Sequence, residues 1–165
     1  MKIADIYIRV SSGVQRIGSG QQRQSESCEK WCRENNVQVR RTINDVCSAF
    51  HGHNLSKGNL KIALDEYRKA YWHQLGEPLT DEECDKDIKE VTPPNYLVVE
   101  TFDRFSRQKP LEVVITLMWM SIFGTKLAIV NENLIIDGTA FMGKTIFKDQ
   151  GRIRIEDHQG GRILF

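Results

Sequence analysis

Two hydrophobic runs of the sequence end in side chains that could act on a phosphate group. In the first, YIRVSSGVQ, Arg9 and Ser11 share strand parity, so an extended chain places both side chains on one face. The second run, YLVVETF, leads into three more such residues, Asp103, Arg104 and Arg107. A hydroxyl that attacks a phosphodiester needs charge stabilisation on the phosphoryl oxygens, which metal ions or a cluster of arginines can provide. The two run ends therefore predict a phosphoryl-transfer site.

Asp103 is a possible acid for such a reaction, because the leaving hydroxyl has to receive a proton. Burial would raise the pKa of this carboxyl group and favour that role, whereas nearby arginines would lower it. A helix after the run would place Asp103 and Arg107 one turn apart, on the same side. Salt bridges and loop caps use the same residue types, so these residues taken alone also fit a structural role.

The elements that must position these residues alternate between strands and helices. Residues 2–10 predict a half-buried strand, and residues 37–43 alternate again as a second strand. Between them, Ser19 and Gln22 form the pattern of a capping box that opens a helix, which runs to about Asn35. The stretch NDVCSAFHGHNLSKG predicts a loop. From Asn59 onwards, one face of a further helix is predicted by Leu60, Ala63, Leu64, Tyr67, Ala70 and Tyr71.

The second half of the chain continues this alternation. Residues 96–101 predict a buried strand, Pro110 opens a helix that ends at Gly124, and KLAIVNENLII predicts another strand. This order indicates a single α/β domain with a mostly parallel central β-sheet flanked by helices. We expect the domain to span residues 1–136, with an inserted acidic segment at about 74–94. In the atypical tail, 137–165, the segment GRIRIEDHQGGRILF predicts a short hairpin.

The composition excludes several other classes of protein. Of the 165 residues, 40% are hydrophobic and 27% are charged, which fits a globular domain and not a disordered or fibrous chain. No apolar run is long enough to span a membrane and no signal peptide is evident, so we expect a cytoplasmic protein with reduced cysteines and no membrane partner. The formal net charge is +1, whereas proteins that bind DNA without help usually have a strong excess of basic residues. If the chain binds DNA, much of the binding free energy would therefore come from outside this chain.

Four segments together resemble a known family. YIRVSSGVQ, GSGQQRQ, DVCSAFHGHN and VVETFDRFSR are similar, in this order and over residues 2–135, to the motifs of the catalytic domain of serine site-specific recombinases, the resolvase/invertase family. The resemblance implies DNA recombination or integration of the kind used by mobile elements and prophages. A serine becomes linked to the DNA 5′ phosphate and releases a 3′ hydroxyl. Because this phosphoserine link conserves the energy of the broken bond, no metal or other cofactor is implied.

The same resemblance implies a role for each site residue. Ser11 would be the nucleophile, and Asp103 would assist proton transfer or orient an arginine. The scissile phosphate would be held by Arg9, Arg104 and Arg107. Support would come from Tyr7, Gln15 and Gln24, and from Asp45 and Ser48 in a second loop that approaches the phosphate.

Two departures from the family pattern bear on activity. Only Lys57 stands near the position where the family carries a basic residue after the second loop. Beyond Ile136 the family continues into a long dimerisation helix and a DNA-binding domain, whereas here five glycines between positions 138 and 161 disfavour a long helix. We expect DNA as the partner, and a homo-oligomer, a dimer or a synaptic tetramer, if the missing helix is supplied. The resemblance therefore implies a recombinase that is truncated or defective in its tail, or else a non-catalytic remnant that acts as a protein-interaction module.

Two motifs suggest rival functions. GTAFMGKT, Gly138–Thr145, matches the P-loop pattern of nucleotide-binding proteins, but too little sequence follows for the helix and the later aspartate that a P-loop requires. The pairs Cys28/Cys32 and His51/His53 could suggest zinc, but their spacing is not that of a familiar zinc finger. Nucleotide binding through Gly138–Thr145 is therefore the less favoured alternative function, and we predict no metal site.

Overall fold

A computed structural model of the chain describes residues 1–10, 17–46, 53–76, 92–106, 110–138, 145–149, 152–156 and 162–164. The helices are α1 (Ile17–Glu34), α2 (Asn59–Gln74), α3 (Phe102–Phe105) and α4 (Pro110–Ile122), and η1 (His53–Leu55) is a 3₁₀ turn. The main sheet contains β1 (Lys2–Val10), β2 (Val37–Val46), β3 (Tyr96–Val99), β4 (Lys126–Ile129) and β5 (Leu134–Ile136). A second sheet contains β6 (Thr145–Asp149), β7 (Arg152–Glu156) and β8 (Arg162–Leu164).

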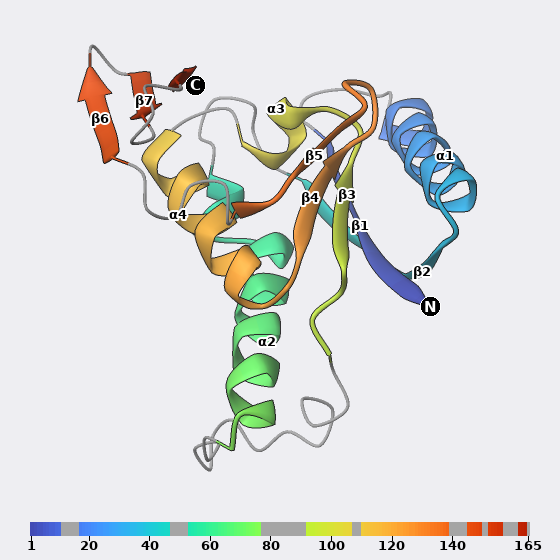
Figure 1. Cartoon of the computed structure of the whole chain (residues 1–165). Coiled ribbons are helices and arrows are strands. Elements are labelled where there is room, and N and C mark those ends of the chain that lie inside the picture. The colour runs from blue at the N-terminus through green and yellow to red at the C-terminus, as the bar shows by residue number, and fades with distance from the viewer. Residues whose placement is uncertain are drawn as a thin grey trace.

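The main sheet has the strand order β2-β1-β3-β4-β5. Its first four strands are parallel and β5 pairs with β4 in the antiparallel direction. Helix α1 covers one face, whereas α2 and α4 lie on the other (Figure 1). Each face therefore has its own hydrophobic core, and the predicted α/β architecture with a mostly parallel sheet is confirmed.

Strand β1 is an interior strand of the sheet, between β2 and β3. The prediction that it is half-buried is wrong, because helices cover both of its faces and every residue from Ala4 to Arg9 is buried. Ile6 and Ile8 pack in the core beneath α1, whereas Tyr7 packs in the core beneath α2 and α4. A polar residue on the second face therefore needs partners inside the protein.

Asp5 is the most buried of these polar residues, with no exposed surface. Strand β2 has a bulge opposite it, since Ala4 pairs with Val39 but Asp5 pairs with Arg41, so the extra residue Arg40 also reaches the carboxylate. The Arg40 guanidinium donates to both carboxylate oxygens, from Nε at 2.8 Å and from Nη2 at 2.7 Å. Arg41 Nε donates at 3.0 Å and the Tyr67 hydroxyl of α2 donates to the same carboxylate. These contacts fasten β1, β2 and α2 together.

Strand β2 is longer than its pattern predicted, because it continues through Val46 and not only to Ile43. Asn44 and Asp45, which were predicted to lie in a loop, therefore belong to the strand and pair with Ile8 and Arg9. The sequence does not show this extension clearly, because the two consecutive arginines at the bulge interrupt the alternation of apolar and polar residues along the strand. The strand carries Asp45 to the same level of the sheet as Arg9.

Three other predicted boundaries differ from the structure. Strand β3 ends at Val99 and not at residue 101. Helix α1 already includes Ile17, so Ser19 lies inside the helix and does not cap it. KLAIVNENLII contains two antiparallel strands, β4 and β5, and not one, because Asn133 has a positive φ of 47° and allows a tight turn between them. The helix predicted from Asn59 is confirmed, with Leu60, Ala63, Leu64, Tyr67 and Ala70 buried.

In the tail, β7 and β8 pair as the predicted hairpin, and β6 adds a third strand to it. Strands β6 to β8 hold all the described residues after Gly138. Most of the predicted inserted segment, residues 77–91, lies outside the described part of the chain, as do Cys47 and Cys84.

Gly138 joins the main sheet to α4 by a close approach of two backbones. A Cβ atom on this residue would overlap the carbonyl oxygen of Leu117 and lie 3.0 Å from the amide nitrogen of Met118. We expect Gly138→Ala to lower the free energy of unfolding by about 1–3 kcal/mol, because the backbone of α4 has to move. Urea unfolding followed by tryptophan fluorescence measures this loss.

Gly20→Ala is the matched control for this substitution. Gly20 lies within α1 and a Cβ there would have no atom within 4 Å, so the change should raise stability by about 0.5–1 kcal/mol through helix propensity. Equal effects of the two substitutions would contradict the close packing of Gly138 on α4.

Candidate functional site

The predicted site residues that the structure describes lie near the carboxyl ends of three neighbouring strands. Arg9 ends β1 beside Asp45 on β2, and α3, which carries Asp103 and Arg104, begins shortly after β3 ends. Parallel strands deliver their carboxyl ends to one edge of the sheet, so residues far apart in sequence meet there. Four of the predicted residues, Ser11, Gln15, Ser48 and Arg107, lie outside the described part of the chain. Ser11 follows Arg9 by two positions in the sequence, and Arg107 follows Ser106 directly.

Arg9 is held by both its side chain and its backbone. Only 3% of the residue is exposed, and its Nη2 donates to the carbonyl oxygen of Asp103. Strand β3 pairs with residues Ala4–Ile6 of β1. Further along β1, the side-chain amide of Gln24 bonds to the backbone of Arg9, with Oε1 accepting from the Arg9 amide at 3.4 Å and Nε2 donating to the Arg9 carbonyl at 3.2 Å. Gln24 therefore contacts Arg9 directly.

Helix α3 is a single turn that displays Asp103 and Arg104. Thr101 precedes it in an extended conformation, and the Arg104 amide donates to the Thr101 carbonyl at 3.0 Å. The Thr101 hydroxyl donates to the carboxylate of Asp103. This short turn places the backbone carbonyl of Asp103 against the guanidinium of Arg9, and Arg104 is the next residue of the turn.

Tyr7 and Asp45 are hydrogen-bonded to each other in the protein interior, next to Arg9 on β1 and β2. The Tyr7 hydroxyl donates to Asp45 Oδ2 at 3.2 Å. The Asp45 carboxylate also accepts the first two backbone amides of α2, from Asn59 at 2.7 Å and from Leu60 at 3.1 Å. A Cβ on Gly58, which has a φ of 95°, would lie 2.8 Å from Asp45 Oδ1, so only glycine lets the carboxylate approach so closely. Asp45 therefore caps α2 and fixes where the loop between β2 and α2 ends.

Two buried polar residues at this edge of the sheet were not predicted from the sequence to belong to the site. Asn54, in η1, is completely buried and its Nδ2 donates to the Phe105 carbonyl at 2.5 Å. Glu100, just after β3, is 3% exposed and forms an ion pair with Arg23 of α1 at 3.1 Å. An acidic residue that directly follows a buried apolar strand is a usable signal for Glu100. The sequence around Asn54 contains only loop-forming residues, so it carries no comparable signal.

The described residues do not support the two rival motifs. A P-loop needs a helix at its lysine and threonine, but Thr145 is the first residue of strand β6. Cys28 and Cys32 are buried free thiols, and burial raises the pKa of Cys28 to about 12 and that of Cys32 to about 11. Thiolates are the metal ligands, so these groups are poorly suited to zinc. Within the described ranges, no three His, Cys, Asp or Glu side chains form a possible metal-binding group.

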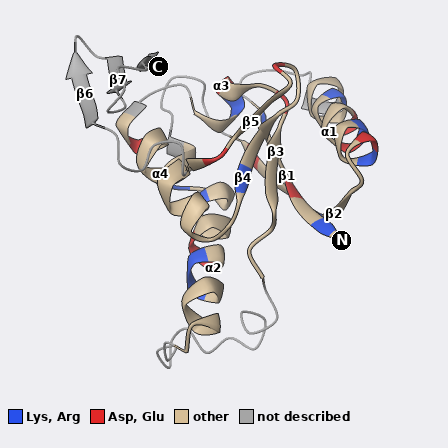
Figure 2. Ribbon diagram, viewed as in Figure 1, with Lys and Arg blue, Asp and Glu red and all other residues tan. Residues whose placement is uncertain are grey.

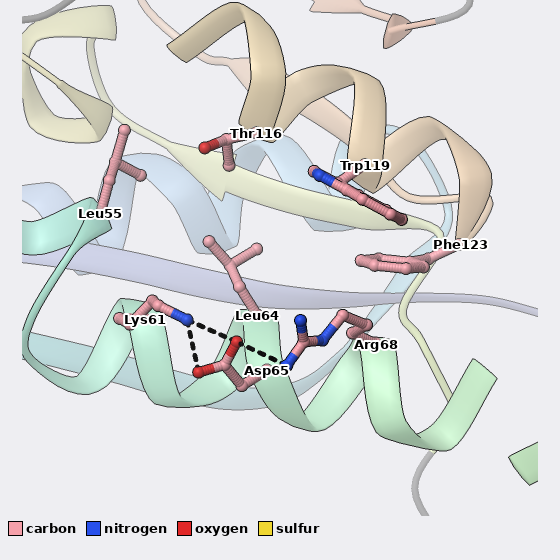
Figure 3. Close-up of a pocket in the computed structure, with 8 residues that line it drawn as sticks. All are labelled: Leu55, Lys61, Leu64, Asp65, Arg68, Thr116, Trp119 and Phe123. Carbon is pink, nitrogen blue, oxygen red and sulfur yellow. Dashed lines mark hydrogen bonds and ion pairs between the residues drawn. The ribbon is translucent and has the colours of Figure 1, made fainter. Parts of the chain in front are cut away.

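A groove of about 210 Å³ lies elsewhere on the molecule, between α2 and α4 (Figure 3). Trp119 and Phe123 stack along one side of it, with ring centroids 6.3 Å apart. On the other side Asp65 pairs with Lys61 at 2.5 Å and with Arg68 at 3.7 Å. No predicted site residue lines this groove.

Among the described helices, none is long and apolar enough to cross a membrane.

The sequence matches no protein-family model and no curated protein. Similarity appears at the level of solved structures. A resolvase family site-specific recombinase from Streptococcus pneumoniae superimposes with a TM-score of 0.52 and 16% identity, over 82% of this chain and 76% of that one. The C-terminal catalytic domain of ISC1926 TnpA, an IS607-like serine recombinase, gives a TM-score of 0.51 and 19% identity, over 78% and 70%.

A third solved structure, the N-terminal catalytic domain of TP901-1 integrase, gives a TM-score of 0.53 and 19% identity, over 85% of this chain and 88% of that one. All three solved structures are of recombinases or integrases, in agreement with the family that the four sequence motifs resemble. The chain therefore has the fold of serine recombinase catalytic domains.

Proposed function

We propose that this chain is the catalytic domain of a DNA recombinase that cleaves and rejoins strands through Ser11. The observation that carries the proposal is the meeting of Arg9, Asp103 and Arg104 at one sheet edge, where β1 leads into Ser11. Arg9 bonds to the backbone carbonyl of Asp103, which is 94 positions away in the sequence and directly precedes Arg104. The fold and the motifs independently favour the same reaction.

The reaction consists of a phosphoryl transfer that needs no external energy. The Ser11 oxygen forms a bond to phosphorus while the bond from phosphorus to the DNA 3′ oxygen breaks. The serine loses its proton and the 3′ oxygen gains one, with Asp103 assisting the transfer or orienting an arginine. Arg9, Arg104 and Arg107 stabilise the negative charge that accumulates on the phosphoryl oxygens. Attack by a 3′ hydroxyl on the phosphoserine reverses the steps and rejoins the DNA.

The charge distribution indicates that this domain needs help to hold DNA. Lysine and arginine alternate with acidic residues along α1 and no basic band follows the helix (Figure 2). Ion pairs between Lys30 and Glu34 and between Arg33 and Glu29 neutralise much of that surface. Counter-ion release therefore contributes little to binding by this face, and further subunits or domains would supply affinity.

A second candidate is a non-catalytic module that binds another recombinase subunit. The outer face of α4 favours it, because four apolar side chains at helical spacing are 37–47% exposed: Leu111, Ile115, Trp119 and Ile122. Helix faces of this kind bury themselves against a partner. This candidate and the catalytic one make opposite predictions for Ser11.

Covalent trapping of DNA separates the two candidates. The protein is incubated with 3′-labelled fragments of the DNA that flanks its own gene, some of them nicked to prevent religation, and run on a denaturing gel. We expect a slow, protease-sensitive band that disappears in Ser11→Ala. Ser25→Ala is the matched control, because Ser25 lies on α1 and bonds only to Glu29 at 2.9 Å among the hydrogen bonds of its side chain. The absence of any band from the folded natural chain would favour the non-catalytic module.

A further inference from the structure

Asn54 links η1 to the turn that carries Asp103 and Arg104. Its Nδ2 donates to the Phe105 carbonyl at 2.5 Å and also approaches the Arg104 carbonyl at 3.4 Å. These carbonyls end a one-turn helix and therefore have few intrahelical partners. Because carbonyl oxygens only accept hydrogen bonds, the group that faces them has to be the amide NH₂. This fixes the orientation of the Asn54 side chain and leaves Oδ1 on its other side.

Two buried atoms near this contact have unused hydrogen-bonding capacity. Asn54 Oδ1 and Arg104 Nε are both buried, and neither has a hydrogen-bond partner in the part of the chain that the structure describes. One is an acceptor and the other is a donor, on residues that are already joined through the Arg104 carbonyl. Buried polar atoms without partners are unfavourable, and native proteins rarely keep them without a functional reason.

We propose that Asn54 is a positioning residue for Arg104. When a phosphodiester enters the site, Asn54 Oδ1 accepts the Nε–H of Arg104, and the two Nη groups of the guanidinium then face the phosphate oxygens. Arginine presents its donors in a rigid planar fork, so a single bond to Nε sets the direction of the others. The proposal rests on the proposed phosphate site and adds the group that aims one of its arginines.

The same contact gives Asn54 two separate tasks. Its Nδ2 holds the backbone of α3, and its Oδ1 orients a side chain of α3. A residue that acted only as a structural brace would need the first task alone. Substitutions that separate the NH₂ donor from the oxygen acceptor therefore distinguish the two explanations.

The test follows the Nε–H signal of Arg104 by ¹⁵N–¹H NMR, with the signal assigned by its loss in Arg104→Lys. The probe is a thymidine dinucleotide, which carries one phosphodiester. In the natural chain we expect the dinucleotide to shift this signal and to slow its hydrogen exchange about tenfold, the effect of one hydrogen bond of ordinary strength. In Asn54→Ala the shift should remain, because the Nη groups still bind phosphate, but the slowing of exchange should be lost.

Asn54→Asp supplies the opposite result from a side chain of the same shape. The carboxylate keeps an acceptor for Nε–H and loses the donor to the α3 carbonyls, so the Arg104 signal should already exchange slowly without the dinucleotide. A purely structural brace would move both variants in the same direction. If Asn54→Ala fails to fold, the Asp variant decides: slow exchange before addition supports the proposal, and fast exchange overturns it.

The outcomes also separate this proposal from the proposed function. A dinucleotide response that is identical in the natural chain and in Asn54→Ala would overturn the role of Asn54 and leave the phosphate site intact. No response of Arg104 in the natural chain would overturn the phosphate site, and the role of Asn54 with it.

Discussion

An Arg9→Ala chain is expected to remain folded and to form the covalent DNA adduct about 100- to 1,000-fold more slowly than the natural chain, the usual cost of removing one transition-state charge stabiliser. Two effects act in the same direction. The guanidinium no longer neutralises the phosphoryl oxygens, and the bond from Arg9 to the Asp103 carbonyl is lost, so α3 is less firmly held. Single-turnover trapping on nicked DNA measures the rate, and circular dichroism checks the fold.

Arg9→Lys and Arg33→Ala complete this experiment. Lysine keeps the charge but lacks the planar fork that could bond to the Asp103 carbonyl and a phosphate oxygen together, so it should restore only part of the rate. Arg33 is an exposed arginine of α1, and its loss should leave the rate unchanged. A folded Arg9→Ala chain that forms the adduct as fast as Arg33→Ala would contradict the assignment of Arg9 to the phosphate.

Asp5→Asn is expected to lower the free energy of unfolding by about 3 kcal/mol, the typical loss when one member of a buried ion pair is removed. The substitution leaves Arg40 and Arg41 facing a neutral amide, which can no longer accept all of the donors that reach the carboxylate. Urea unfolding measures the change. Glu34→Gln is the control. Glu34 forms an ion pair with Lys30 on the exposed side of α1, where such pairs contribute little to the free energy of unfolding. Equal losses in the two variants would contradict the role of Asp5.

The pH dependence of unfolding gives an independent test of the same carboxylate. Burial alone would raise the pKa of Asp5, but hydrogen bonds from Arg40 and Tyr67 and the positive charge of Arg40 outweigh it and lower the pKa. The unfolded chain therefore binds this proton more tightly than the folded one. The stabilising contribution is complete above about pH 4, near the ordinary pKa of aspartate, and is lost as the pH falls through the lower pKa of the folded state. Asp5→Asn should lack this part of the acid-induced loss of stability.

Most of the fold and the central part of the candidate site follow from the sequence. The alternation of residues in β1, the apolar face of α2 and the Pro110 start of α4 each depend on local spacing, which the sequence displays directly. The meeting of Arg9 with α3 follows from the rule that parallel strands end at one edge. The motifs that resemble those of serine recombinases added the roles that we expect of the site residues.

The features that the sequence did not predict depend on contacts between distant segments. Asn54 is buried because two backbone carbonyls of α3 need a donor there, which no spacing around residue 54 shows. The side-chain amide of Gln24 bonds to the backbone of Arg9, which lies on a different element. Both faces of β1 are buried because it is an interior strand and helices cover the sheet on both sides.

The bulge at Arg40 determines which side of the sheet the later residues of β2 face. Before it, Val37 points into the core beneath α1, and after it the odd-numbered residue Ile43 points into the core beneath α2 and α4. The extra residue has therefore reversed which parity faces α2, and Asp45 meets Tyr7 only because of that reversal. If Arg40 paired as a regular strand residue and formed no bulge, Asp45 would face the opposite side of the sheet, away from the α2 amides that it caps. The bulge therefore decides whether this carboxylate can reach α2 and Tyr7.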